Sequence, residues 1–171
     1  MARGIWTVLI VGWLGLSLAA CGYRFAGGGS MPEGIRFVGI SMLENRTSET
    51  GVEDQITNSI IYEFTRSGSV TVTDPARAEA VLSGVINRIL VDSIAFTSAN
   101  VAQERRVTIY VDLTLTGADG RVIWTVRDMT ANEDYPVESD KLATERNKRE
   151  AIAAASERLA ERAFRRMTED F

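Results

Sequence analysis

The sequence contains no histidine, a single cysteine and only three prolines among its 171 residues. The absence of histidine removes the commonest general base and the commonest metal ligand. A lone cysteine cannot form a disulfide within the chain. The net charge of −4 argues against nucleic-acid binding, which depends on basic patches that neutralise phosphates. We therefore expect no metal, no cofactor and no nucleic-acid partner.

The one cysteine, Cys21, directly follows the most apolar run in the chain, which spans residues 5–18. Arg3 is the only charged residue in the first 20, and small residues precede the cysteine. This order is typical of a secretory signal peptide. The run is also shorter than the roughly 20 apolar residues of a membrane-spanning helix. We therefore expect residues 1–20 to be a cleaved signal peptide.

The segment Leu18-Ala19-Ala20-Cys21 resembles the bacterial lipobox. The resemblance implies cleavage before Cys21, an S-diacylglycerol on its thiol and an N-palmitoyl group on the new amino terminus. Acyl chains of this kind would anchor the protein to a membrane and remove Cys21 from nucleophilic or zinc chemistry. The alternative is a core cysteine after an uncleaved anchor. Gly22 follows the cysteine where lipoproteins retained at the inner membrane typically carry Asp, which favours the outer membrane.

Residues 21–34 then form a linker, because Gly27-Gly28-Gly29-Ser30 is followed by no Gly-Lys-Ser/Thr of a phosphate-binding loop. Residues 35–171 are long enough for one domain with a single core. Their hydrophobic periodicity predicts strands at 35–43, 69–73, 81–96 (with a bulge), 107–116 and 122–132, and helices at 52–66 and 139–168. The fold class expected is α+β, with two helices packed on one face of a mixed or antiparallel sheet of about four strands.

Local signals support several of these boundaries. Thr50 and Glu53 have the spacing of a capping box, and Gly68 stands where a helix would end. Asp119-Gly120 is typical of a two-residue hairpin turn. The helix at 139–168 could instead lie on a membrane surface, but its alanine-rich face favours close packing on the sheet.

The alternation of apolar and polar residues at 107–116 predicts a strand with one buried face and one polar face. The polar face consists of Thr108, Tyr110, Asp112, Thr114 and Thr116. It could be solvated or could line another protein. Asp112 and Asp128 could form a carboxylate pair across the hairpin, but nothing supplies a nucleophile, an oxyanion site or metal ligands beside them. We therefore expect a protein that is not an enzyme.

Three short motifs together resemble one family: residues 21–25 (Cys-Gly-Tyr-Arg-Phe), 44–47 (Glu-Asn-Arg-Thr) and 78–84 (Ala-Glu-Ala-Val-Leu-Ser-Gly). They are similar to the LptE family of outer-membrane lipopolysaccharide-assembly lipoproteins. The resemblance implies a non-enzymatic protein that plugs the LptD β-barrel, helps that barrel assemble and binds lipopolysaccharide. The alternative is an outer-membrane lipoprotein that activates a peptidoglycan synthase. A long proline-rich spacer after Cys21 would favour that alternative, but the short segment here contains only Pro32.

Lipopolysaccharide is anionic, so a protein that binds it should offer basic side chains near a loop. The chemistry and location of Arg105, Arg106 and Lys141 make them the candidate lipopolysaccharide-binding residues. Equally, the two arginines could be the solvated end of a strand.

Overall fold

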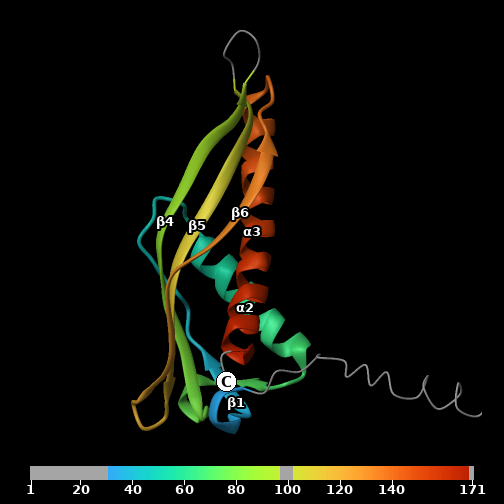
Figure 1. Ribbon diagram of the computed structural model, residues 1–171. Helices are drawn as coiled ribbons and strands as arrows, with labels where there is room; N and C mark the ends of the chain where they lie inside the picture. The colour runs from blue at the N-terminus through green and yellow to red at the C-terminus, as the bar shows by residue number, and fades with distance from the viewer. Residues whose placement is uncertain (1–30, 97–101, 170–171) are drawn as a thin grey trace, which may run out of the picture.

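The computed structural model describes residues 31–96 and 102–169 of the chain. The expected signal peptide, Cys21 and almost all of the linker lie outside the described residues. The elements in chain order are η1 (Pro32–Gly34), β1 (Phe37–Ile40), β2 (Glu44–Asn45), α2 (Val52–Ser67), β3 (Thr71–Thr73), η2 (Pro75–Arg77), β4 (Ala80–Phe96), β5 (Ala102–Gly117), β6 (Val122–Pro136) and α3 (Lys141–Glu169). The three long strands β4, β5 and β6 run side by side, and α3 extends along them (Figure 1).

All the strands belong to one six-stranded sheet in the order β3-β1-β4-β5-β6, with β2 also paired to β4. β1 is parallel to β3 and β4, whereas β4, β5 and β6 are antiparallel neighbours. The α+β class with two helices on a mixed sheet is therefore confirmed. The expectation of about four strands is wrong, because the sheet has six: the short strand predicted at 69–73 is present as β3, and β2 spans only two residues, which is too short for a periodic sequence pattern.

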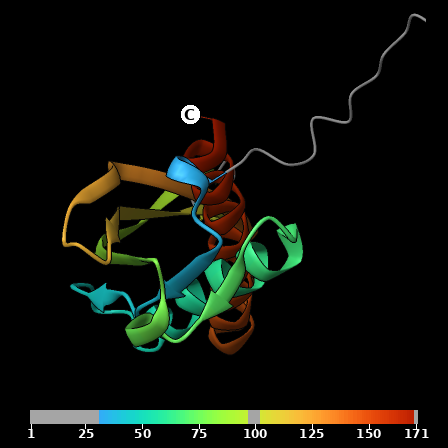
Figure 2. The ribbon, with the colours of Figure 1, turned by 90° about the horizontal axis from the view of Figure 1, so that it is seen from below.

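The core lies between the sheet and the two helices, which cover the same face (Figures 1 and 2). The alternation predicted for β5 is present, since the side chains of one parity are completely buried: Val107, Ile109, Val111, Leu113 and Leu115. α2 buries Ile56, Ile60 and Phe64 at helical spacing. The ring of Phe64 meets that of Phe164 on α3 edge to face, with centroids 5.1 Å apart, which joins the helices to each other.

The apolar face of α3 belongs to this core. Ala155, Leu159 and Ala163 are completely buried, and the small alanine side chains allow the helix to approach the sheet closely. The choice of core packing over a membrane-surface helix is therefore consistent with the structure. Within residues 31–96 and 102–169, no helix is long and apolar enough to cross a membrane.

The predicted start of α2 needs a correction. Thr50 provides no side-chain cap, because the N-cap residue is Gly51 in a left-handed conformation with φ of 83°. Glu53 instead accepts a hydrogen bond from the side-chain amide of Asn45 at 2.7 Å, which ties the helix to β2. At the other end, Gly68 is left-handed, with φ of 66°, as the sequence predicted.

Two features of the long strands were also predicted. The bulge in β4 is present as a register shift between Ile86 and Arg88. Asp119 and Gly120 do form the turn between β5 and β6, but the turn is longer than two residues, because the N–H of Gly117 donates to the carbonyl of Arg121.

Candidate interaction surface

The face of the long sheet opposite the helices is polar. Thr108, Tyr110, Asp112, Thr114 and Thr116 are all partly exposed there, between the equivalent positions of β4 and β6. Hydroxyl groups line part of this face, and the side-chain oxygens of Thr114 and Thr125 lie 3.3 Å apart on neighbouring strands. On β5 this face is rich in hydroxyl groups, as the sequence predicted, but the neighbouring strands add the charged residues Arg88, Asp92, Asp128 and Asp134.

Two of the charges on this face are held together. The guanidinium of Arg88 on β4 lies over the ring of Tyr110, 3.8 Å from its centroid. Its Nη2 atom lies 3.4 Å from Oδ1 of Asp128 on β6. This contact spans all three long strands and stabilises their side-by-side arrangement on the uncovered face.

The candidate carboxylate pair of Asp112 and Asp128 is not a pair of facing carboxylates. Asp128 lies at the register shift between β5 and β6 with a positive φ of 47°, and its backbone N–H donates to Oδ1 of Asp112 at 2.7 Å. This hydrogen bond lowers the pKa of Asp112 below its ordinary value. A general acid would need the opposite shift, and the hydrogen bond holds the bulged part of β6 against β5.

The three candidate lipopolysaccharide-binding residues lie at the same end of the molecule, where β5 and α3 begin. Arg105 is paired in register with Tyr135, whose side chain is buried on the helix-covered face. Arg106 is paired with Asp134 and faces the uncovered side. Lys141 is exposed and is the first residue of α3. The two arginines are therefore neighbours in the chain but lie on opposite faces.

Arg106 already has a carboxylate partner. Its Nε atom donates to Oδ1 of Asp134 at 2.6 Å and its Nη2 atom to Oδ2 at 2.8 Å, a bidentate geometry. The hydrogen bonds raise the pKa of Arg106 and lower that of Asp134. The sequence does not reveal this cross-strand pair, because its two residues are 28 positions apart and come together only through the register of β5 with β6.

The two edges of the long sheet differ. Along β6, side chains of α3 donate to strand carbonyls: Arg158 to Asn132 at 2.9 Å, Asn147 to Pro136 at 3.1 Å and Arg162 to Thr130. β4 is paired on its outer side only near its start, with β1 at Ala80–Leu82 and with β2 at Val85–Ile86. The described part of the chain supplies no strand beyond that point. One edge is thus covered by side chains, and half of the other is open.

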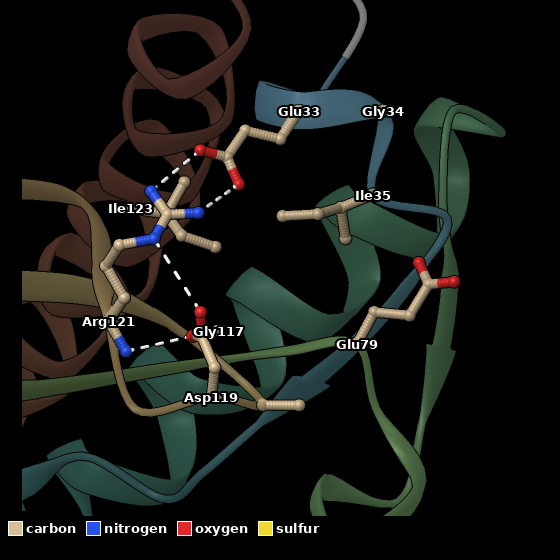
Figure 3. A pocket seen from close by; sticks show the side chains of 9 residues that line it. Glu33, Gly34, Ile35, Glu79, Gly117, Asp119, Arg121 and Ile123 are labelled. Carbon is tan, nitrogen blue, oxygen red and sulfur yellow. Dashed lines mark hydrogen bonds and ion pairs between the residues drawn. The ribbon is translucent and has the colours of Figure 1, made fainter.

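A cleft of about 380 Å³ lies at the opposite end of the molecule, between η1 and the β5–β6 turn (Figure 3). Arg121 donates to both carboxylate oxygens of Glu33, at 2.8 and 2.7 Å. Glu79 accepts the backbone N–H groups of Arg36 and Phe37, at 2.7 and 3.1 Å. These charges are paired within the protein, and they hold η1 against the β5–β6 turn and the start of β1 against Glu79.

Within the described residues, no group of three or more acidic, histidine or cysteine side chains could hold a metal ion. The fold and its surface define a single α+β domain with one uncovered polar sheet face, one open sheet edge and basic residues at the end farthest from where the chain enters.

The family follows from comparison with known proteins. Residues 37–167 match the family model LptE, described as lipopolysaccharide-assembly, and the chain belongs to this family. Comparison with curated proteins gives no match. The fold is similar to lipoprotein B from Nitrosomonas europaea, with 12% identity, a TM-score of 0.60 and coverage of 86% of this chain and 90% of that one.

Two further structures have the same fold. The rare lipoprotein B from Shewanella oneidensis is 15% identical, with a TM-score of 0.53 and coverage of 77% of this chain and 95% of that one. The minor lipoprotein from Acinetobacter baumannii is 14% identical, with a TM-score of 0.52 and coverage of 80% and 92%. The resemblance stated from three short motifs is therefore confirmed, and the chain is a lipopolysaccharide-assembly lipoprotein in the general sense of its family.

Proposed function

We propose that this protein is an outer-membrane lipoprotein that occupies the lumen of an LptD-type β-barrel, helps that barrel assemble and binds lipopolysaccharide on its way to the cell surface. Membership of the LptE family supports the general role. The observation that carries the proposal is the uncovered face of β4, β5 and β6, which is long and polar and on which Arg88 and Arg106 are each paired with an aspartate of the same face. The lumen of a large outer-membrane barrel is also polar, so the two surfaces have compatible chemistry.

The arrangement of the two ends supports the same proposal. η1 lies at one end of the molecule, held by the pair of Arg121 with Glu33, and β5 and α3 begin toward the other end (Figure 1). Arg105, Arg106 and Lys141 belong to the first turns or residues of those two elements. With lipids on Cys21, the entry end would face the membrane anchor. The basic end would then extend away from that anchor, where it could meet the phosphates of lipopolysaccharide.

The proposal is tested with full-length lipoprotein in which a photo-crosslinking amino acid replaces Thr108 on the uncovered face. The control carries the same amino acid at Tyr62 on the solvent side of α2, which is 67% exposed and so freely accessible. After irradiation of cells and solubilisation of the outer membrane in detergent, we expect a one-to-one adduct with a large β-barrel protein from Thr108 and much less from Tyr62.

An adduct of Thr108 with a peptidoglycan synthase would instead support the alternative activator function. The absence of any barrel adduct, with the protein present in the outer membrane, would contradict the proposed lumen location. Lipopolysaccharide binding is measured separately, so failure of the partner experiment and failure of ligand binding can be told apart.

A further inference from the structure

The second half of β4 has an outer edge without a partner strand. From Arg88 to Phe96 it is paired with β5 on one side, and within residues 31–96 and 102–169 no strand is paired with the other side (Figure 1). Alternate residues of a strand direct their backbone N–H and C=O groups to the same side, so this edge presents a row of donors and acceptors without strand partners. The edge is therefore a template for one more strand.

The side chains along this edge are unusually apolar for a surface. Leu90 is exposed by 42%, Val91 by 39% and Phe96 by 52%. Leu90 lies on the uncovered face, opposite Thr108. Val91 lies on the helix side, opposite the buried Val107. Apolar side chains on both faces of one stretch are typical of a strand that is covered on both faces, not of a free edge.

One carboxylate on this edge, that of Asp92, forms no ion pair within the described part of the chain. Asp92 is exposed, and Arg106 stands opposite it in the register of β4 with β5. Arg106 is held by Asp134, however, and Arg88 on the same face is held by Asp128. A strand that pairs with β4 should therefore carry a basic residue where it passes Asp92.

We infer that an extended segment of the barrel partner adds a strand to the open edge of β4 along residues 89–96. The segment is apolar on both faces, which covers Leu90 and Val91, and it places Lys or Arg beside Asp92. It does not overlap β2, because the last residue of β4 that contacts β2 or the turn after it is Ile86. One added strand also keeps the protein and the barrel in a one-to-one complex.

The inference rests on the proposed function, which supplies the partner. Leu90 and Asp92 belong to the uncovered face that would lie against the barrel lumen, opposite Thr108 and Arg106 of β5. The open edge is thus the margin of the same contact surface. A segment of the barrel that reaches this margin meets the unpaired backbone groups of β4 without any change in the position of the domain.

The chemistry of the edge favours a protein strand over a hydrocarbon chain. The acyl chains of lipopolysaccharide would cover Leu90 and Val91, but they would leave the backbone N–H and C=O groups and the charge of Asp92 without partners. A strand satisfies the backbone groups, the apolar side chains and the carboxylate together. In this mode of recognition, main-chain hydrogen bonds supply affinity and alternate side chains supply specificity.

The first test places a photo-crosslinking amino acid at Leu90, Ile94 or Phe96 of the full-length lipoprotein in cells. Thr108 is the reference for the lumen location, and Tyr62 on α2 gives the background. Mass spectrometry then identifies the cross-linked residues of the barrel. Paired strands advance together by about 3.3 Å per residue. We therefore expect the cross-linked position to move steadily along one barrel segment as the probe moves along β4.

The possible outcomes separate this inference from the proposed function. A barrel adduct from Thr108 with none from the three edge positions would overturn the added strand and leave the lumen location intact. Edge adducts that scatter over several barrel segments, or that form with lipid alone, would also overturn it. The absence of a barrel adduct from Thr108 and from the edge would contradict both proposals.

The second test reverses the charge of Asp92 in the protein that carries the probe at Leu90. Asp92→Lys should lower the yield of barrel adduct about fivefold, because a basic residue of the added strand would then meet a like charge. The matched control is Glu157→Lys, an exposed position of α3 that changes the net charge by the same amount. A cooperative thermal transition verifies that each variant is folded. Equal yields from the two folded variants, or a mapped segment without Lys or Arg beside Asp92, would overturn the inference.

Discussion

Arg105 and Arg106 are adjacent in β5 but lie on opposite faces of the sheet. Arg105 shares its face with the buried Tyr135, whereas Arg106 lies on the uncovered face and is held by Asp134. The two guanidiniums therefore cannot both bind one phosphate group from the same face of the sheet. Arg105 is on the face that α3 covers, and Lys141 begins that helix. Of the three candidate residues for lipopolysaccharide binding, Arg105 and Lys141 therefore belong with α3, and Arg106 lies on the other face of the sheet.

The first prediction is that Arg105→Glu weakens lipopolysaccharide binding more than Arg106→Glu does. Arg106 is already neutralised by a bidentate carboxylate, so a phosphate would have to compete with Asp134 for it. Displacement of labelled lipopolysaccharide from the full-length protein at fixed ionic strength measures the effect. Arg127→Glu, an exposed charge elsewhere on β6, is the control for net charge. Equal losses in all three variants would point to a non-specific charge effect.

The second prediction concerns Asp112→Asn and pH. The N–H of Asp128 lowers the folded-state pKa of Asp112, so this carboxylate stabilises the fold above its unfolded pKa of about 3.9 and loses that effect as pH falls through the folded value. At pH 7 we expect a loss of about 1 kcal/mol. The corresponding decrease in melting temperature is about 3 °C. The difference from the parent protein should shrink below pH 4, and a difference independent of pH would contradict the assignment.

The third prediction is that Phe64→Ala destabilises the domain strongly. Phe64 is completely buried and meets Phe164 at the contact between α2 and α3, so its removal leaves a cavity that costs about 3–5 kcal/mol. Phe37→Ala is the matched control, since that ring is 45% exposed on β1. In chemical denaturation followed by circular dichroism, Phe64→Ala should unfold at a lower denaturant concentration than Phe37→Ala. Similar midpoints for the two variants would contradict a central role of Phe64 in the core.

The fourth prediction is that Arg158→Ala combined with Arg162→Ala exposes the β6 edge. Both side chains donate to carbonyls of β6, and removal of each donor should cost up to about 1 kcal/mol. The double variant should also scatter more light on heating, because an uncovered strand edge promotes association. Arg165→Ala with Arg166→Ala, two exposed positions of the same helix, is the control. Identical scattering in the two double variants would count against protection of this edge.

The fifth prediction concerns the expected lipid anchor, which lies outside the described residues. Cys21→Ala should abolish acylation and leave an unprocessed precursor, because the lipobox chemistry requires the thiol. Labelling of cells with a clickable fatty acid, followed by gel electrophoresis, measures both effects. Normal labelling and normal cleavage of the variant would show that the lipobox interpretation is wrong.

Periodic sequence was sufficient to predict the long elements. The alternation along β5 and the four-residue spacing of Ile56, Ile60 and Phe64 each specify a buried face, because side-chain direction follows directly from strand or helix geometry. Gly68 was predictable for a similar local reason, since glycine readily adopts the left-handed conformation at a helix end. The conformation of these elements is therefore determined by residues that are close together in the chain.

The features that sequence could not give depend on residues far apart in the chain. β2 exists because β4 supplies a partner strand, not because its two residues prefer to be extended. The N-cap residue of α2 is Gly51 and not Thr50, and the carboxylate of Glu53 accepts a hydrogen bond from the side chain of Asn45. The candidate basic residues were visible as charges, but the partner of Arg106 became evident only from the register of β5 with β6.

The coverage of the β6 edge by Arg158 and Arg162 limits how large any assembly of these sheets can become. A sheet with two open edges can add copies at both sides and grow into a fibre without end. Here the side chains of α3 bind the outer carbonyls of β6, so a strand of another molecule finds few free acceptors at that edge. The helix that completes the core therefore also removes one of the places at which another chain could extend the sheet.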